Sequence, residues 1–207
     1  RSYELCTFNS DIFYKKIQYF FVENIGIERA EFIDNKYNEP IPTTYSGYKL
    51  ESGVCVFGRN QLTGKQVWSP QGGYPGDPLY REFHLKDLES GLHYFKVTGN
   101  DNKQIYNPEE AFERSKVHAD HFYRLITEDL KRKNKENKNI NILPIIASPY
   151  DCELFGHWWH EGVDWIDHLY QIFSNQPSIK IQTLSEYIQE NYDNLSIIRM
   201  KPSTWGE

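Results

Sequence analysis

Asp151 is the residue of this sequence best placed for catalysis, because it follows closely on an apolar run at residues 140–149. We predict that this run forms one buried strand that ends at Pro149, since it is too short to cross a membrane. In β/α barrels the catalytic side chains lie at the carboxyl ends of strands. A carboxylate at this point therefore has a position that suits acid–base chemistry.

His157, Trp158 and Trp159 come shortly after Asp151. Aromatic faces beside a carboxylate suit a sugar ring, which offers apolar C–H faces and a rim of hydroxyl groups. A purely structural interpretation is also open: Asp151 would cap the helix that follows, and the two tryptophans would belong to the core. Position along the sequence does not separate these two interpretations.

The elements that must position these residues are short apolar runs alternating with helical stretches. The expected strands cover residues 16–23, 54–59, 94–98, 140–149, 179–182 and 196–200. The expected helices cover residues 108–133, 154–173 and 184–191, the first of them with Asn107 as N-cap and Pro108 in its first turn. This alternation predicts an α/β fold with a mainly parallel sheet, either open or closed into a barrel.

Composition limits the class of protein. The 207 residues carry a formal net charge of −6, and their basic residues are scattered apart from a solvated cluster at 131–138, so neither nucleic acid nor a membrane is an expected partner. Three widely separated cysteines do not form a disulfide framework, which favours a reducing cytoplasm. The only methionine is Met200, and we expect a segment truncated at both ends.

Several other kinds of site are not supported by the motifs. The loop at 66–84 is rich in Gly, Pro and aromatic residues. Such a loop either covers an active site or is a simple surface turn. It is not a phosphate loop, because it lacks the Lys-Ser/Thr that follows the glycines in that motif. His157, His160 and Glu161 do not form the HExxH order of a zinc site, and His118 and His121 have no Cys or acid at ligand spacing. These histidines therefore do not indicate a metal site. No nucleophile elbow is present either, so we do not expect acyl transfer.

Three blocks of the sequence together resemble glycoside hydrolase family 57, and within it the α-1,4-glucan branching enzymes most closely. They occur in the family's order and read GRNQLTGKQVWSPQGGYPGDPLYREFH at 58–84, PYDCELFGHWWHEG at 149–162 and PSTWGE at 202–207. The resemblance implies a (β/α)₇ barrel with an added helical domain, of which residues 1–207 would be an incomplete, C-terminal part. It also implies a retaining mechanism.

The resemblance assigns roles to five residues. Asp151 matches the family's general acid/base. Arg59, Gly76 and Trp205 fall at positions that contact bound glucan in branching enzymes, and Trp68, in the QVWS stretch, matches a sugar platform. For Asp151 to be protonated in the resting enzyme, its pKa must be raised, and we expect burial near Trp158 or Trp159 and the nearby carboxylate of the nucleophile to raise it.

The sequence departs from the family in two places. The family's nucleophile is a Glu in a WLPE-C-like segment that would precede Arg1, and Glu4, Glu23 and Glu153 are not in such a context. Retaining chemistry needs two carboxyl groups about 5–5.5 Å apart, and only one is identified here. The family's Asp-Thr-His-Gly-like stretch aligns with residues 23–26, where Ile25 replaces the imidazole. This replacement implies altered specificity or a weakened enzyme.

The function expected from the resemblance is the formation of α-1,6 branches on an α-1,4-glucan by a longer parent protein. An α-amylase or a 4-α-glucanotransferase of the same family is an alternative, as is a glucan-binding homologue that has lost catalysis. The expected partner is an α-glucan polysaccharide such as amylose. Neither a metal nor an organic cofactor is implied, and the sequence does not indicate an oligomeric state.

Overall fold

The computed structural model describes residues 17–69, 72–136, 142–176 and 178–204. The chain divides into two compact units. The first contains Arg1–Gln61, Glu128–Pro149 and Ile181–Glu207, and the second contains Leu62–Thr127 and Tyr150–Lys180. None of the described helices is long and apolar enough to cross a membrane.

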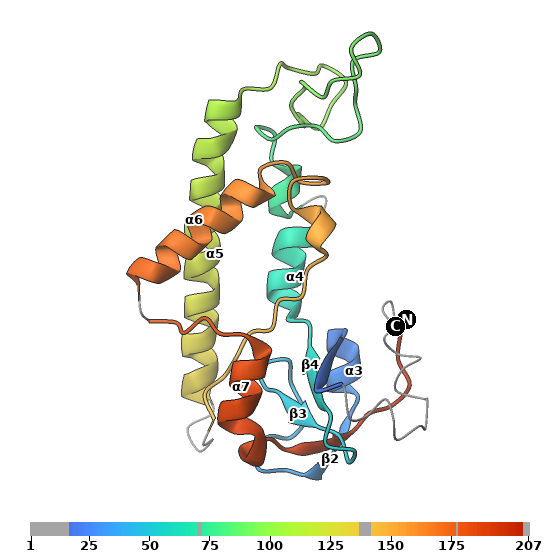
Figure 1. Ribbon diagram of the computed structural model, residues 1–207, viewed down its shortest axis with the longest axis vertical. Coiled ribbons are helices and arrows are strands. Elements are labelled where there is room, and N and C mark those ends of the chain that lie inside the picture. Colours follow the sequence, from blue (N-terminus) through green and yellow to red (C-terminus); the bar gives the residue numbers. More distant parts are fainter. Residues whose placement is uncertain (1–16, 70–71, 137–141, 177, 205–207) are drawn as a thin grey trace. The chain divides into compact units, whose positions relative to one another are not determined.

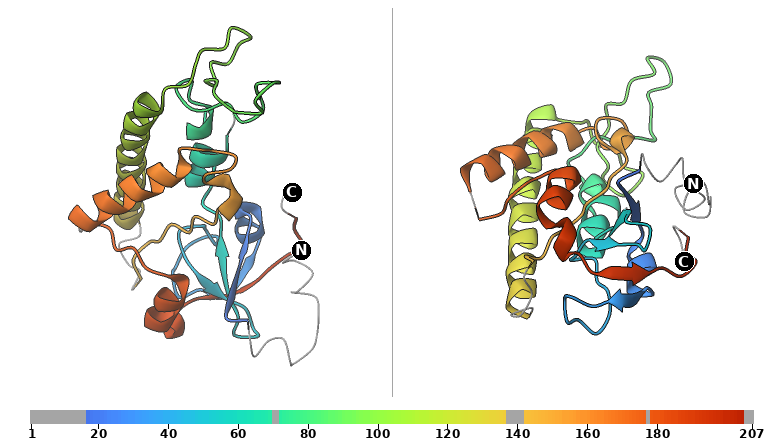
Figure 2. Two further views of the ribbon diagram at one scale, coloured as in Figure 1. Left: turned by 45° about the horizontal axis from the view of Figure 1, so that its top comes forward. Right: turned by 60° about the horizontal axis from the view of Figure 1, so that its bottom comes forward.

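The first unit contains a five-stranded sheet in the order β1-β4-β3-β5-β2 (Figures 1 and 2). Its strands are β1 (Tyr19–Val22), β2 (Glu31–Asp34), β3 (Tyr48–Lys49), β4 (Cys55–Gly58) and β5 (Ile197–Arg199). The pairs β1–β4 and β3–β5 are parallel, whereas β3–β4 and β2–β5 are antiparallel. The sheet is therefore mixed, and the prediction of a mainly parallel sheet is wrong.

The short connection between β3 and β4 explains this difference. Residues 50–54 form a tight turn in which Leu50 N donates to Val54 O over 2.9 Å, and Gly53 has a positive φ of 86°. A turn of this length joins only antiparallel strands, because a parallel pair needs a crossover of a dozen or more residues. The strands expected at 16–23, 54–59 and 196–200 are confirmed as the shorter β1, β4 and β5.

Residues 142–149 do not form the buried strand that the apolar run predicts. The segment makes two isolated backbone bonds, from Ile145 N to Tyr45 O at 2.9 Å and from Asn60 N to Ala147 O at 3.1 Å. Pro144 and Pro149 have no backbone N–H, so a continuous ladder cannot form. Residues 94–98 and 179–182 are not strands either, and the former make only isolated bridges.

Helices α3 (Asn24–Glu28) and α7 (Leu184–Asn191) also belong to the first unit, with the short η3 (Tyr192–Asn194) after α7. The prediction for α7 is confirmed, and Thr183 and Glu186 form a capping box at its start. Tyr187 on α7 packs edge-on against Phe57 of β4 at 5.8 Å between ring centroids. The core around this contact includes Val22, Ile27, Tyr48, Cys55, Val56, Leu195 and Ile198.

The second unit is helical, with an aromatic core. Its elements are α4 (Gln61–Trp68), η1 (Tyr74–Gly76), α5 (Pro108–Glu136, whose residues after Thr127 belong to the first unit), η2 (Cys152–Leu154) and α6 (Gly162–Asn175). Figure 1 shows α5 as the longest helix. Its predicted start is confirmed, since Asn107 Oδ1 accepts from the backbone N–H groups of Glu109 and Glu110 at 3.0 and 3.2 Å.

The helix expected at 154–173 begins later, at Gly162. Gly156 has a φ of 89°, and its N–H donates to Trp159 O over 2.8 Å, which closes a tight loop ahead of α6. The rings behind this loop fill the core of the unit. Trp159 lies 5.4 Å from Trp165 and 6.1 Å from Tyr74, measured between centroids.

Candidate active site

Arg59 and Glu23 lie together at the carboxyl ends of β4 and β1. Because these strands are parallel and in register, the residues that follow them come to the same edge of the sheet. Arg59 N donates to Val22 O over 2.8 Å, and its guanidinium pairs with Glu23 Oε1 at 3.2 Å. The two side chains are 22% and 19% exposed, so the ion pair is partly shielded from water and restrains the guanidinium.

The third family block approaches the same edge. A Cβ placed on Gly26 of α3 would lie 3.0 Å from Ser203 Oγ, so residue 203 packs closely against this helix. Ile25 precedes Gly26 in α3 and is half-buried. Trp205, two residues beyond Ser203, lies outside the described residues, and its assignment to glucan binding stays a prediction.

Asp151 lies at the start of the second unit's short η2 helix, with an exposed side chain. Its backbone is extended, and its carbonyl oxygen accepts from Leu154 N at 3.1 Å. The side chain occupies the N-cap position without making a capping hydrogen bond. Asp151 therefore does not serve as a helix cap, and the expectation that the neighbouring tryptophans bury it is wrong.

The two adjacent tryptophans have different environments. Trp159 is 1% exposed and belongs to the core, as the structural interpretation requires. Trp158 is 43% exposed, and its Nε1 donates to Glu153 Oε1 over 3.3 Å, which ties the indole to the turn that begins at Asp151. The ring of Phe83 lies 4.3 Å from Trp158 between centroids. The structural interpretation is thus correct for Trp159, whereas the interpretation of Trp158 as a ring for a sugar stays a prediction.

Trp68 and Gly76 belong to one folded loop. Trp68 ends α4 and is partly buried, and Gly76 ends η1. Between them, Gly73 N donates to Ser69 O over 2.7 Å, and a Cβ at Gly73 would lie 2.5 Å from that oxygen. The close approach requires glycine at position 73, which directly precedes η1 and Gly76.

A buried polar network, which the sequence analysis missed, supports this loop from α5. Arg114 Nε donates to Asp77 Oδ2 over 2.7 Å, and the same oxygen lies 3.4 Å from His118 Nε2. Burial, together with the charge of Arg114, lowers the pKa of His118 to about 4. The imidazole is therefore neutral at pH 7. With its proton on Nε2, which faces the Asp77 carboxylate, Nδ1 accepts from the Tyr80 hydroxyl at 2.7 Å. The i, i+4 spacing of Arg114 and His118 was the one available sequence signal.

Glu161 is a second buried group that sequence reasoning did not assign. It is 1% exposed, and its Oε1 accepts from Arg81 N at 3.1 Å. Burial raises the pKa of this carboxyl, against the opposing effect of the Tyr106 hydroxyl. No group of three or more His, Cys, Asp or Glu side chains is arranged to hold a metal ion among the residues that the structure describes.

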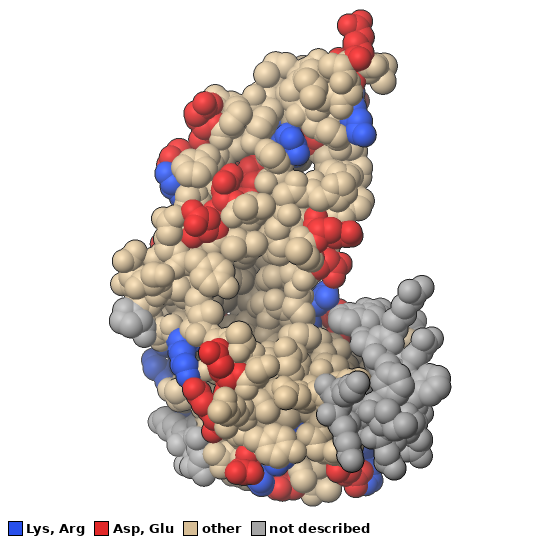
Figure 3. Space-filling model, in the orientation of Figure 1, with Lys and Arg blue, Asp and Glu red and all other residues tan. Residues whose placement is uncertain are grey.

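Charge on the surface is dispersed. On the face that Figure 3 shows, the described Lys and Arg side chains stand among acidic and neutral residues and do not form a continuous basic surface. On α5, Arg124 pairs with Asp120 at 2.8 Å.

No family model matches the chain, but known proteins do. A 1,4-alpha-glucan branching enzyme of Thermococcus kodakarensis is 39% identical over 200 residues, which are 92% of this chain and 29% of that enzyme. The crystal structure of a GH57-type branching enzyme from Pyrococcus horikoshii matches with a TM-score of 0.81 at 38% identity, covering 95% of this chain and 35% of that one. An α-amylase structure from Thermotoga maritima matches with a TM-score of 0.78 at 28% identity, covering 92% and 39%.

The chain therefore spans about a third of the length of these relatives. The identities of 37–39% to archaeal branching enzymes exceed the 28% to the amylase, in agreement with the resemblance seen in the three sequence blocks. The prediction of the family is confirmed. Over the third of their length that it covers, this chain is a homologue of the branching enzymes of glycoside hydrolase family 57.

Proposed function

We propose that this chain is the C-terminal part of the catalytic barrel of a retaining α-glucan branching enzyme, and that another part of a longer protein supplies the nucleophile. The observation that carries the proposal is the Asp151 carboxylate, which is exposed and makes no capping hydrogen bond. An exposed indole, Trp158, is held at the same turn by Glu153. A carboxylate and an exposed aromatic ring on one turn suit a glycosidic oxygen and its pyranose ring.

In the proposed reaction, a glutamate of the longer protein attacks the anomeric carbon of an α-1,4-glucan. Asp151 gives its proton to the departing glycosidic oxygen, so that a glycosyl-enzyme ester and a shortened glucan form. Asp151, now a carboxylate, then removes a proton from the 6-hydroxyl of an acceptor glucan. That oxygen displaces the ester, which yields an α-1,6 branch and regenerates both side chains.

Arg59, Trp68, Gly76 and Trp205 are the proposed glucan-binding residues. Arg59 is supported by its position at the carboxyl edge of the sheet and by the Glu23 ion pair, which restrains a side chain that donates to sugar hydroxyls. Gly76 is supported by the close Ser69–Gly73 packing, which places Gly73, at the start of η1, against Ser69 just after α4. Branching also requires that an acceptor glucan, and not water, reaches the ester.

Hydrolysis or disproportionation of α-glucan is the second candidate function. The 28% identity to an α-amylase favours it, because an amylase and a branching enzyme differ in the acceptor that takes the glycosyl group. A glucan-binding protein without catalysis is the third, and Ile25 in place of the family's imidazole favours that reading.

The test uses the longer protein that contains this chain, incubated with amylose. New α-1,6 linkages are counted by proton NMR, and reducing ends are counted in parallel. We expect Asp151→Asn to lower the branching rate by about 10²–10⁴-fold, because the amide cannot exchange a proton. Asp167→Asn, at an exposed acid of α6, is the matched control and should keep full activity. Normal branching by Asp151→Asn would overturn the proposal, and reducing ends without branches would favour the amylase.

A further inference from the structure

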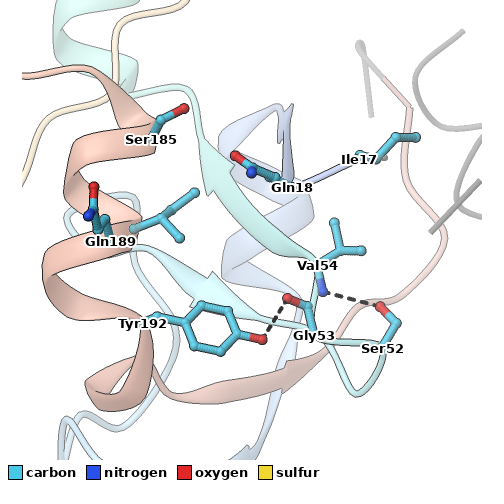
Figure 4. A pocket seen from close by; sticks show the side chains of 9 residues that line it. Ile17, Gln18, Ser52, Gly53, Val54, Ser185, Gln189 and Tyr192 are labelled. Atoms are coloured by element: carbon cyan, nitrogen blue, oxygen red, sulfur yellow. Dashed lines mark hydrogen bonds between the residues drawn. The ribbon is translucent and has the colours of Figure 1, made fainter. Parts of the chain in front are cut away.

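A pocket of about 520 Å³ lies in the first unit, at the amino ends of β1 and β4 (Figure 4). Gln18 precedes β1, and Ser52 and Val54 precede β4, whereas Glu23 and Arg59 follow the other ends of the same two strands. Four residues at about 3.3 Å each separate the two ends of these strands by roughly 13 Å. The pocket is therefore distinct from the carboxyl edge that belongs to the candidate active site.

The chemistry of the lining is polar but neutral. None of the residues that line the pocket is charged. Figure 4 shows Ser185 and Gln189 along α7 on one side and Gln18 and Val54 on the other, with Tyr192 below them. Amide side chains donate and accept, and hydroxyl groups do both, so this lining matches a ligand whose own groups do both as well.

Part of the pocket wall is fixed by contacts within the protein. The Tyr192 hydroxyl donates to Gly53 O over 3.1 Å, and Lys49 Nζ lies 4.5 Å from the centre of the same ring. A Cβ at Gly53 would lie 3.0 Å from the Tyr192 hydroxyl, and the φ of this glycine is +86°. Val54 N donates to Ser52 Oγ over 3.4 Å. The turn at 52–54 and the Tyr192 ring are thus positioned before any ligand arrives.

We propose that this pocket binds one or two glucose residues of an α-glucan, as a non-catalytic site separate from the carboxyl edge of the same sheet. A pyranose offers apolar faces to Val54 and Ile188 and hydroxyl groups to the amides of Gln18 and Gln189. The volume is within the range of about 300–1,000 Å³ for small-molecule sites. The identity of the sugar rests on the proposed function, while the neutral, polyhydroxylated class of ligand rests on the lining alone. A second contact on the same polymer would raise the effective concentration of glucan at the enzyme.

The test is an NMR titration of the ¹⁵N-labelled 207-residue chain with maltotetraose. The side-chain amide signals of Gln18 and Gln189 are identified as those lost in Gln18→Ala and Gln189→Ala. We expect both signals to shift along one saturation curve, with a dissociation constant on the order of 1 mM. Gln189→Ala should raise that constant about 3–10-fold, read from the Gln18 signal, because one hydrogen bond is lost. Ser185→Phe should abolish the shift by filling the space.

Two controls define the site. Glu190→Ala changes an exposed residue of α7 that does not line the pocket, and it should leave the curve unchanged. Inorganic phosphate should not move either signal, since the lining residues carry no positive charge. Amide signals that stay unmoved by maltotetraose up to about ten times the expected constant would overturn the inference. If the Trp68 indole signal shifts while the two glutamine signals stay unmoved, this inference fails but the proposed function does not. The Asp151→Asn assay tests that function separately.

Discussion

The Asp151 turn and the network around His118 belong to the same unit, but their polar side chains differ in exposure to solvent and in hydrogen bonding. Asp151 and Trp158 are exposed, and the Asp151 carboxylate makes no capping bond. Asp77 and His118 are buried, partnered and held by Tyr80 and Arg114 over distances of 2.7–3.4 Å. The comparison separates groups available to a ligand from groups that fix the loop beneath them. Substitutions in the two regions should therefore differ in what they damage.

The largest difference in stability is expected between the adjacent tryptophans. Trp159→Ala removes a buried ring from the aromatic core and should lower the free energy of unfolding by about 3–5 kcal/mol. Trp158→Ala removes a ring that is 43% exposed and should cost about 1 kcal/mol or less. Urea denaturation of both variants measures the two losses. Equal losses would show that Trp158 is a packing residue and would remove it from the candidate site.

The next effect concerns His118 and acid. Its pKa of about 4 in the folded chain is below the ordinary 6.5, so the unfolded chain binds the proton first. Stability should therefore fall as pH drops from about 6.5 to about 4, by up to about 3 kcal/mol at 1.36 kcal/mol per pH unit. His118→Asn keeps an acceptor for Tyr80 but does not titrate. Between pH 6.5 and 4 the free energy of unfolding of this variant should fall less than that of the natural chain. An equal fall in both would show that His118 is not the titrating group.

Glu161 should show the opposite sign. Burial raises its pKa above 4.5, so the folded chain binds the proton first and the carboxylate form is destabilising at neutral pH. Glu161→Gln keeps the acceptor for Arg81 N without the charge. We expect this variant to be more stable than the natural chain at pH 7, with the gap narrowing as pH falls toward 4.5. Thermal unfolding at several pH values measures the gap, and a gap independent of pH would show that another group is responsible.

The smallest effect is expected at the carboxyl edge of the first unit. Glu23 and Arg59 are each about one-fifth exposed, and solvent screens their ion pair. A double-mutant cycle with Glu23→Gln and Arg59→Met should give a coupling energy of about 1 kcal/mol or less in denaturant unfolding. A coupling of several kcal/mol would mean that this pair contributes to stability as the buried His118 network does. Partly exposed and buried polar groups would then not differ as we propose.

The sequence could predict the elements whose signals are local. Asn107 and Pro108 mark the start of α5, and the Thr183 capping box marks α7. It could not predict the mixed sheet, because β3 has only two residues and its pairing depends on the turn at 50–54. The apolar run at 142–149 misled the strand assignment, since prolines remove the donors that a ladder needs.

The candidate site was predicted in part for the same reason. Asp151 was identified from the apolar run ahead of it, although that run forms no strand, and the pairing of Arg59 with the end of β1 depends on a parallel register that no sequence motif indicated. Burial is a property of the packed chain, and adjacent letters such as Trp158 and Trp159 do not reveal it. The partners of His118 come from residues 77 and 80, about forty positions away, so its role as a neutral acceptor had no motif to mark it.

Gly26 gives a different view of how such a chain can change over evolution. Its missing side chain leaves room for Ser203, which would otherwise lie 3.0 Å from a Cβ, with Val22 at 3.2 Å. A side chain at position 26 would thus press on Ser203 in the C-terminal block, whereas the neighbouring Ile25 is only half-buried. The packing of a segment distant in the sequence therefore limits the size of the residue at position 26.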